Sequence, residues 1–170
     1  KLKDKEYTPE EKAEIAEAVA VGAIKFSILR QAIGGDIIFD FEKSISFEGD
    51  SGPYLQYTAV RAKSVLEKSQ ISNTKSQINS KSQIQNWDLS REALAKWEVT
   101  ETEKLLYRFP EVVERAGKEY APHYIVGYLL ELASSFNSFY ANNKIIDDND
   151  PAFPYKIALT SAVYHTLKNG

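Results

Sequence analysis

The sequence predicts an all-α protein, a helical bundle that carries one polar low-complexity insertion. Apolar residues recur at helical spacing along most of the chain, and capping residues, prolines and glycines mark where these stretches begin and end. The insertion is indicated by the tetrapeptide KSQI, which occurs at 68–71, 75–78 and 81–84 among Asn, Ser and Thr residues. Such a stretch cannot offset the entropy of ordering, so we expect a mobile surface loop with a nascent helix over about 68–88.

The first predicted helix opens with a capping box, Thr8-Pro9-Glu10-Glu11, and is expected to end at Gly34-Gly35. Its apolar stripe comprises Ile15, Val19, Gly22, Phe26, Leu29 and Ile33. Residues 36–41 should form a short extended or irregular connection, because polar and apolar residues alternate there.

The next helix is expected to begin in a glycine-bearing loop. Gly49 and Gly52 permit backbone angles that are closed to most residues. Ser51 or Gly52 can cap the helix, and Pro53 has the fixed φ angle suited to a first helical turn.

Tyr54, Tyr57 and Arg61 share one side of this helix, within roughly 60° of one another at about 100° per residue. A separate stripe for the core comprises Leu55, Ala59, Ala62 and Leu66. Two interpretations are open here. The tyrosines stack on unpaired bases, each worth about 1–3 kcal/mol, with the arginine against a phosphate or a ring; or both tyrosines pack against a neighbouring helix.

Beyond the insertion, further helices are predicted over 90–97, 100–108, 111–120, 121–142 and from 154 or 155 to 168. Pro110 is expected to end the second of them, because proline lacks an N–H group and clashes with the preceding turn. The helix over 121–142 has the clearest apolar stripe, made of Ile125, Leu129, Leu132, Phe136 and Phe139.

Composition excludes several classes of protein. The net charge of −3 and the isoelectric point near 5.5 argue against a generally basic coat, so RNA binding must come from a local patch. Lys68, Lys75 and Lys81 of the repeat are either phosphate contacts or solvated cations. No stretch is apolar enough for a membrane span, and we expect a monomeric, cytoplasmic protein without membrane contact.

No catalytic constellation is evident. The chain contains no cysteine and two histidines, and it lacks the phosphate-binding and nucleophile-elbow motifs. The acidic cluster at 147–150 resembles part of a calcium loop, but Pro151 and the missing glutamate indicate a solvated turn. His123 and His165 are expected to be packing or capping residues. We therefore expect no catalytic residue, metal ligand or bound cofactor in this chain.

Residues 48–61, EGDSGPYLQYTAVR, closely resemble the segment that opens the anticodon-binding domain of arginyl-tRNA synthetases. Residues 16–26 (AEAVAVGAIKF) and 41–49 (FEKSISFEG) resemble the end of the same family's catalytic module. The later motifs recur in the family's order: FPEVV at 109–113, APHYI at 121–125, YLLELA at 128–133, FNSFY at 136–140 and the stretch 159–167.

The resemblance implies a bundle of the class I synthetase anticodon-binding type, DALR-like, over 53–170, preceded at 1–52 by the end of the catalytic module. It implies recognition of the anticodon stem and loop of tRNA-Arg, with ATP, Mg²⁺ and arginine handled by a catalytic portion that precedes Lys1. The chain also lacks an initiator methionine, so we expect it to be part of a longer polypeptide.

By the same resemblance, the tRNA-binding residues are Tyr54, Tyr57, Arg61 and Tyr140, with Glu48, Gly49, Asp50 and Gly52 of the loop pressing on the same region. Two departures concern the short final helix that the family has beyond Gly170 and the insertion after Lys68. A second hypothesis is a free-standing helical module that binds tRNA, other RNA or a protein without catalysis. A bundle without a ligand would leave the aromatic face unexplained.

Overall fold

The computed structural model describes residues 7–37, 39–76, 99–147 and 149–170. These residues contain helices and irregular connections and no strand, which confirms the all-α prediction. The helices are α1 (Pro9–Leu29), α2 (Phe41–Ser44), α3 (Gly52–Ser76), α5 (Glu101–Lys118), α6 (His123–Asn142) and α7 (Phe153–Asn169). None of the helices in these ranges is long and apolar enough to cross a membrane.

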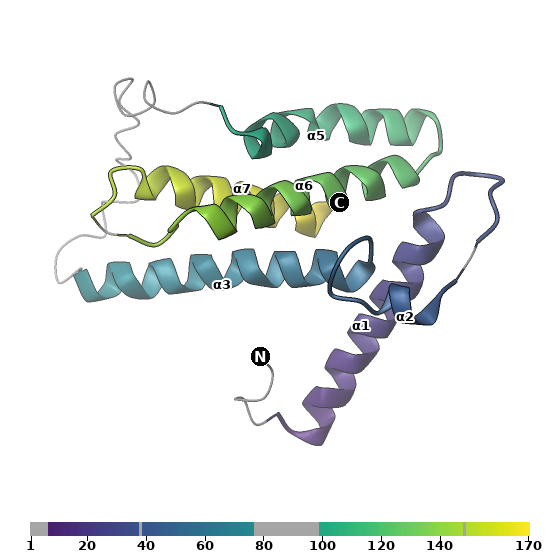
Figure 1. Cartoon of the computed structure of the whole chain (residues 1–170), viewed down its shortest axis with the longest axis horizontal. Coiled ribbons are helices and arrows are strands. Elements are labelled where there is room, and N and C mark those ends of the chain that lie inside the picture. Colours follow the sequence, from purple (N-terminus) through teal and green to yellow (C-terminus); the bar gives the residue numbers. More distant parts are fainter. Residues whose placement is uncertain (1–6, 38, 77–98, 148) are drawn as a thin grey trace.

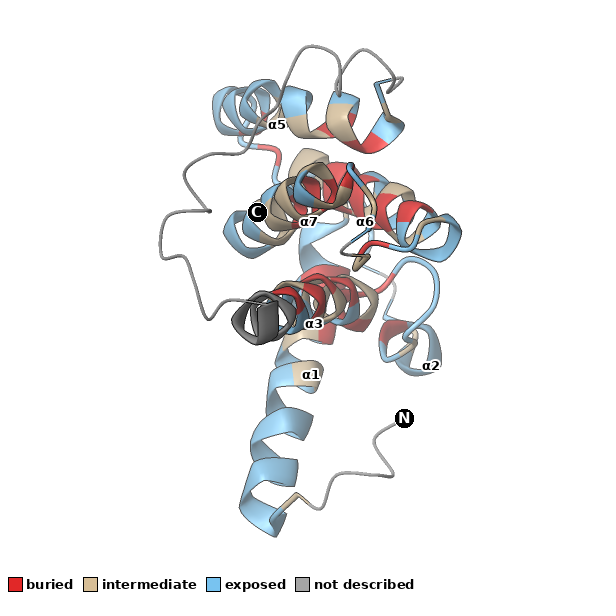
Figure 2. Cartoon of the chain, turned by 90° about the vertical axis from the view of Figure 1, so that its left-hand side faces the viewer, coloured by how far each residue is buried: buried red, intermediate tan, exposed pale blue. Residues whose placement is uncertain are grey.

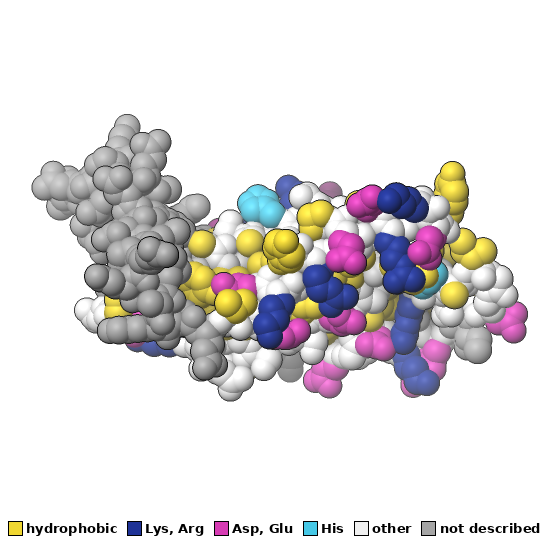
Figure 3. Space-filling model, turned by 90° about the horizontal axis from the view of Figure 1, so that it is seen from above, with side chains coloured by type: hydrophobic (Ala, Val, Ile, Leu, Met, Phe, Trp, Pro, Cys, Tyr) yellow, Lys and Arg dark blue, Asp and Glu magenta, His cyan; other side chains and the backbone are white. Residues whose placement is uncertain are grey.

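Helices α3, α6, α7 and α5 lie side by side, and α1 crosses the first turns of α3 (Figure 1). Helix α5 packs mainly against α6, and α3 packs mainly against α7. Buried residues concentrate on α3, α6 and α7, whereas most of α1 is exposed (Figure 2). The outer face over α5 carries interspersed charges of both signs (Figure 3).

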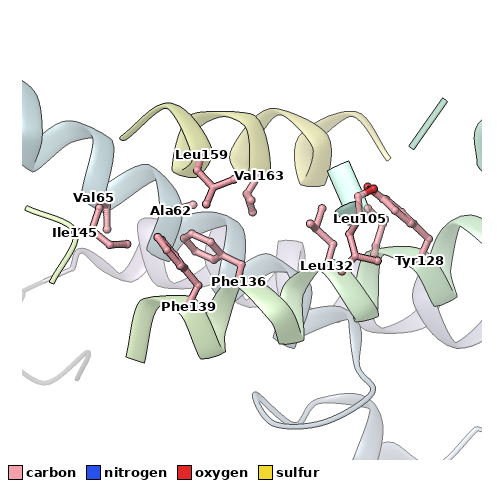
Figure 4. Packing of buried hydrophobic residues seen from close by; sticks show 11 residues of the cluster. Ala62, Val65, Leu105, Tyr128, Leu132, Phe136, Phe139, Ile145, Leu159 and Val163 are labelled. Atoms are coloured by element: carbon pink, nitrogen blue, oxygen red, sulfur yellow. The ribbon is translucent and has the colours of Figure 1, made fainter. Parts of the chain in front are cut away.

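The core lies between α3, α6 and α7, with α5 covering one side. Phe136 and Phe139 of α6 point towards Ala62 of α3 and Leu159 of α7 (Figure 4). Phe136 and Leu132 are completely buried. Four of the five residues in the predicted α6 stripe are buried, and Ile125 packs against the cluster, so the 3.6-residue period identified the buried face of this helix.

Helix starts follow the capping residues of the sequence. The side chains of Thr8 and Thr100 each accept a hydrogen bond from the backbone N–H three residues later. The side chain of the glutamate at that position accepts from the backbone N–H of the threonine. At α3, Ser51 Oγ accepts from the backbone N–H of Tyr54 at 3.1 Å, so Ser51 is the cap. These local signals depend on neighbouring residues only, which is why the sequence places them correctly.

The expected break at Pro110 is wrong, because α5 continues through it from Glu101 to Lys118. Leu105 and Ala116, on either side of the proline, are both buried. Tyr128 Oη also donates to the Leu105 carbonyl oxygen at 2.9 Å. Packing of this common face on α6 outweighs the backbone hydrogen bond that proline removes.

Helix α1 ends at Leu29, earlier than the predicted Gly34-Gly35. The predicted stripe is buried only around Phe26, with Ala23 and Ser27 beside it, while Ile15, Leu29 and Ile33 are exposed. Gly22 packs against Gly52 and Gln56 of α3, but within the described residues no element covers Ile15, Leu29 or Ile33. The final turns therefore gain no burial to hold them helical.

Residues 68–76 are helical, whereas a mobile loop with a nascent helix was expected from residue 68 onwards. Helix α3 continues through Lys68 to Ser76, and Ser69 is buried, with its hydroxyl donating to the Leu66 carbonyl oxygen at 2.7 Å. Extending an existing helix requires no new nucleus, so a polar sequence can continue one. The rest of the insertion and the helix predicted over 90–97 lie outside the described residues.

Candidate nucleic-acid interface

Three of the predicted site residues form one cluster. The guanidinium carbon of Arg61 lies 4.6 Å from the ring centroid of Tyr57 and 4.8 Å from that of Tyr140. Both distances are typical of cation–π contacts. Tyr57 and Tyr140 keep 39% and 40% of their surface exposed, so neither is a core residue. We call Tyr57, Arg61 and Tyr140 the aromatic cluster.

Asn137 of α6 fixes this cluster from behind. Its Oδ1 accepts from Arg61 Nη1, and its Nδ2 donates to Tyr54 Oη at 3.0 Å and to Thr58 Oγ1 at 2.9 Å. A guanidinium has donors only, so the amide oxygen must face Arg61. The amide nitrogen must then face the hydroxyls of Tyr54 and Thr58. Asn137 was not predicted, although its position three residues before Tyr140 places both on one side of α6.

Tyr54 is half-buried, and its hydroxyl is engaged by Asn137. Its position on the same side of α3 as Tyr57 agrees with the predicted spacing. The structure gives it contacts behind the cluster, whereas Tyr57 is more open and lies 6.4 Å, edge to face, from the ring of Phe47. Phe47 was missed because ring contacts between a loop and a helix leave no periodic signal.

A groove opens beside the aromatic cluster, with a volume of about 460 Å³. Its lining residues come from α3, from the end of α6 and from the connection to α7: Tyr57, Val60, Arg61, Ser64, Val65, Lys68, Tyr140, Asn143, Lys144, Ile145 and Ile146. Apolar side chains thus form one wall, while Lys68 and Lys144 supply cations. Sites for small organic groups usually have about 300–1,000 Å³ and a largely apolar lining, so the groove can hold a nucleotide.

The glycine-bearing loop borders the cluster through Phe47. Glu48, Gly49 and Asp50 are exposed, and Gly49 has a positive φ of 75°, as the prediction of an unusual backbone angle requires. Asp50 forms a 2.8 Å ion pair with Arg30 at the end of α1. The loop is therefore anchored to α1.

Gly52 is needed for a different reason from the one predicted. A Cβ atom at this position would lie 2.5 Å from the carbonyl oxygen of Gly22 in α1. Only glycine permits α3 to start so close to the backbone of α1.

A model of the DALR anticodon-binding domain family matches residues 55–170. The chain belongs to this family. The match begins at Leu55, so the DALR domain includes the aromatic cluster and the groove, while α1, α2 and the glycine-bearing loop precede it.

Curated relatives and a solved structure agree with this assignment. The chain is 37% identical over 168 residues to an arginine–tRNA ligase of Thermococcus kodakarensis, covering 99% of this chain and 25% of that protein. It is 40% identical to the arginine–tRNA ligase of Pyrococcus abyssi, covering 94% and 24%. A Thermus thermophilus arginyl-tRNA synthetase structure aligns with a TM-score of 0.72 and 28% identity, covering 97% and 26%. The chain spans about a quarter of the length of these proteins.

One wall of the groove in the DALR domain depends on a buried ion pair. Lys156 Nζ, whose side chain is 8% exposed, donates to Asp150 Oδ2 at 2.7 Å and to the Lys144 carbonyl oxygen at 3.1 Å. Lys156 thereby lowers the pKa of the Asp150 carboxyl below its ordinary value. The same contacts hold the connection from which Ile145 and Ile146 line the groove.

A larger hollow, of about 810 Å³, lies along α5 and α6 and includes Asp50, Glu101 and Glu131 in its lining. Among the described residues no lysine or arginine lines this hollow, its carboxylates are already ion-paired, and the neighbouring face over α5 mixes charges of both signs (Figure 3). Size alone therefore does not identify the nucleic-acid site. The smaller groove has the aromatic rings and the cations that RNA requires.

Proposed function

We propose that this chain recognises the anticodon stem and loop of tRNA-Arg as part of an arginine–tRNA ligase. The observation that carries the proposal is the aromatic cluster: Arg61 lies between two exposed tyrosine rings at the edge of a groove with two lysines. Such rings stack on unpaired bases, and the cations neutralise phosphates. The likeness to arginine–tRNA ligases supports tRNA-Arg as the bound tRNA.

The individual residues have different proposed roles. Tyr57 and Tyr140 would stack on bases of the anticodon loop. Arg61 would lie between the two rings and keep them separated. Tyr54 would support the cluster through Asn137. The loop that contains Glu48, Gly49, Asp50 and Gly52 would border the bound RNA next to Tyr57.

The remaining steps of the reaction are proposed for the rest of a longer, monomeric, cytoplasmic polypeptide, which would bind ATP, Mg²⁺ and arginine. Residues 1–52 would be the end of its catalytic module. Exposed apolar side chains on this part support the proposal, because they give the rest of the polypeptide a surface to cover; they include Ile24, Ile28, Ile33, Phe39, Phe41 and Phe47.

The proposal is tested by titrating the chain with tRNA-Arg and with the same tRNA changed only at the middle anticodon base. Every arginine codon has G at its second position, so this base is always C. We expect the change to weaken binding by more than about 1 kcal/mol, the scale of one lost base contact. Equal binding of both transcripts would reject base-specific recognition and favour a module that binds RNA or protein without reading the anticodon.

Arg61→Lys separates ring stacking from simple charge. Lysine retains the charge but loses the planar fork that contacts Asn137 and both rings. We expect tRNA-Arg to bind about tenfold more weakly, within the range of cation–π and charged hydrogen-bond contributions. The slope of affinity against salt should stay unchanged, because the charge is kept.

The matched control is Arg108→Lys on α5, an exposed arginine with a long 4.0 Å contact to Glu131. It should bind like the parent chain. Unchanged affinity of Arg61→Lys would show that Arg61 acts as a point charge on a phosphate.

A further inference from the structure

Asn143, at the end of α6, lines the groove and also borders the larger hollow, and the orientation of its amide is fixed. It is the C-cap of the helix, and its Nδ2 donates to the carbonyl oxygen of Phe139 at 2.9 Å. A carbonyl oxygen only accepts, so the amide nitrogen must face Phe139. The amide oxygen is left for a ligand, and no described residue donates to it.

Most other polar groups that line the groove are donors. Lys68, Lys144 and Arg61 have no acceptor atoms in their side chains. Tyr57 Oη already accepts from Arg61 Nη2 at 3.0 Å, so its own proton is available to a ligand. The hydroxyls of Ser64 and Tyr140 can take either role. Asn143 Oδ1 is thus a fixed acceptor in a lining whose other polar side chains can all donate.

We infer that Asn143 determines base specificity in this groove by accepting a hydrogen bond from the exocyclic amine of cytosine. This inference rests on the proposed function. Cytosine has an amine at C4 next to acceptors at N3 and O2, which complements one acceptor among several donors. Uracil has an oxygen at C4 and a donor at N3, so both positions would meet a group of the same kind.

The base that the proposed function requires has this pattern. The middle anticodon base of tRNA-Arg is C, and its replacement by U removes the amine and turns N3 into a donor. A site whose polar groups are left unpaired discriminates strongly against such an analogue. Asn143 therefore provides a chemical reason for selecting C at this position. Stacking on Tyr57 or Tyr140 cannot select one base, because every base has a ring face.

The test combines a protein variant with a change of one group on the base. The probe is a hairpin of the tRNA-Arg anticodon arm that carries either cytosine or pyrimidin-2-one, which lacks only the amine, at the middle position. The parent chain should bind the cytosine hairpin about 3- to 10-fold more tightly, the scale of one net hydrogen bond. Asn143→Ala should bind both hairpins equally, as weakly as the parent binds the pyrimidin-2-one hairpin.

Two further variants keep the test decisive. Asn142→Ala removes the neighbouring exposed amide, which bonds only to Ser138, and should retain the parent's preference. Asn143→Asp keeps an acceptor but loses the Nδ2 donor that bonds to the Phe139 carbonyl oxygen, so the orientation is lost and it should bind both hairpins equally and more weakly than the parent binds the cytosine hairpin. Thermal melting of each variant confirms that it is folded.

The outcomes distinguish this inference from the proposed function. If the parent chain prefers the cytosine hairpin and Asn143→Ala keeps the same preference, another residue reads the amine and the inference is wrong, while the proposed function stands. If the parent chain binds no hairpin, or binds both equally and also ignores C-to-U replacement, both proposals are overturned. A preference that Asn143→Ala and Asn143→Asp both lose and Asn142→Ala keeps supports both.

Discussion

Phe136→Ala is expected to lower the free energy of unfolding by about 3–5 kcal/mol, the usual result of truncating a buried phenylalanine. Phe136 has no exposed surface and lies between α6 and the faces of α3 and α7. Its ring is 6.4 Å from that of Phe139 and 6.5 Å from that of Tyr140, so the core supports the aromatic cluster directly. Since a domain is stable by only about 5–15 kcal/mol, this loss removes much of the total.

Urea unfolding followed by far-ultraviolet circular dichroism measures this effect. The control is Tyr107→Ala on α5, whose side chain is 89% exposed and should change stability by less than about 0.5 kcal/mol. A loss below about 1 kcal/mol for Phe136→Ala would mean that α6 is not packed between α3 and α7 as described.

Asp150→Asn is expected to lower the free energy of unfolding at pH 7 by about 2–3 kcal/mol. It removes the carboxylate that is hydrogen-bonded to the buried Lys156 ammonium, and removing one partner of a buried ion pair completely costs about 3–5 kcal/mol. The asparagine oxygen can still accept from Lys156, which reduces the expected loss. The matched control is Glu67→Gln, whose partner Lys63 has a side chain 56% exposed, and which should lose at most about 1 kcal/mol.

The effect of Asp150→Asn should depend on pH in a defined direction. The hydrogen bond from Lys156 lowers the pKa of Asp150 below its ordinary value of 3.8. A carboxyl with a lowered pKa in the folded state stabilises the fold fully above its unfolded pKa, and this contribution is lost as the pH falls through the folded pKa. Urea unfolding of both proteins should therefore show a full difference above about pH 4 that shrinks at lower pH. A difference that is constant down to pH 2 would exclude the ionised Asp150 as its source.

The sequence predicted the helices where local chemistry decides. Thr8, Ser51 and Thr100 start helices because each caps a backbone N–H only three residues away. It failed at Pro110, where burial of residues on both sides of the proline against α6 outweighs a local preference. The predicted burial of the α1 stripe was wrong because tertiary packing is missing there. A periodic face is buried only where another element covers it.

The candidate site was predictable in part. Tyr57 and Arg61 share a face of one helix, so spacing alone grouped them. Tyr140 came only from the family resemblance, because no periodicity relates residues on two different helices. Asn137 and Asn143 were missed, since an asparagine at a helix surface is usually solvated and only the three-dimensional structure shows which of its two amide atoms is engaged. The roles of all these residues in RNA binding remain predictions.

The close approach of Gly52 to Gly22 has a mechanical consequence. Hinges usually form in loops or at the ends of elements. Here, however, the N-terminal end of α3 packs against the α1 backbone, and Asp50 joins the preceding loop to Arg30 by an ion pair. Tyr57 and Arg61 follow within the next three turns of the same helix, so a rotation of α1 carries them with it. An RNA held at the groove would therefore set the orientation of α1, and the proposed boundary at residue 52 would transmit movement between the two parts of a longer polypeptide.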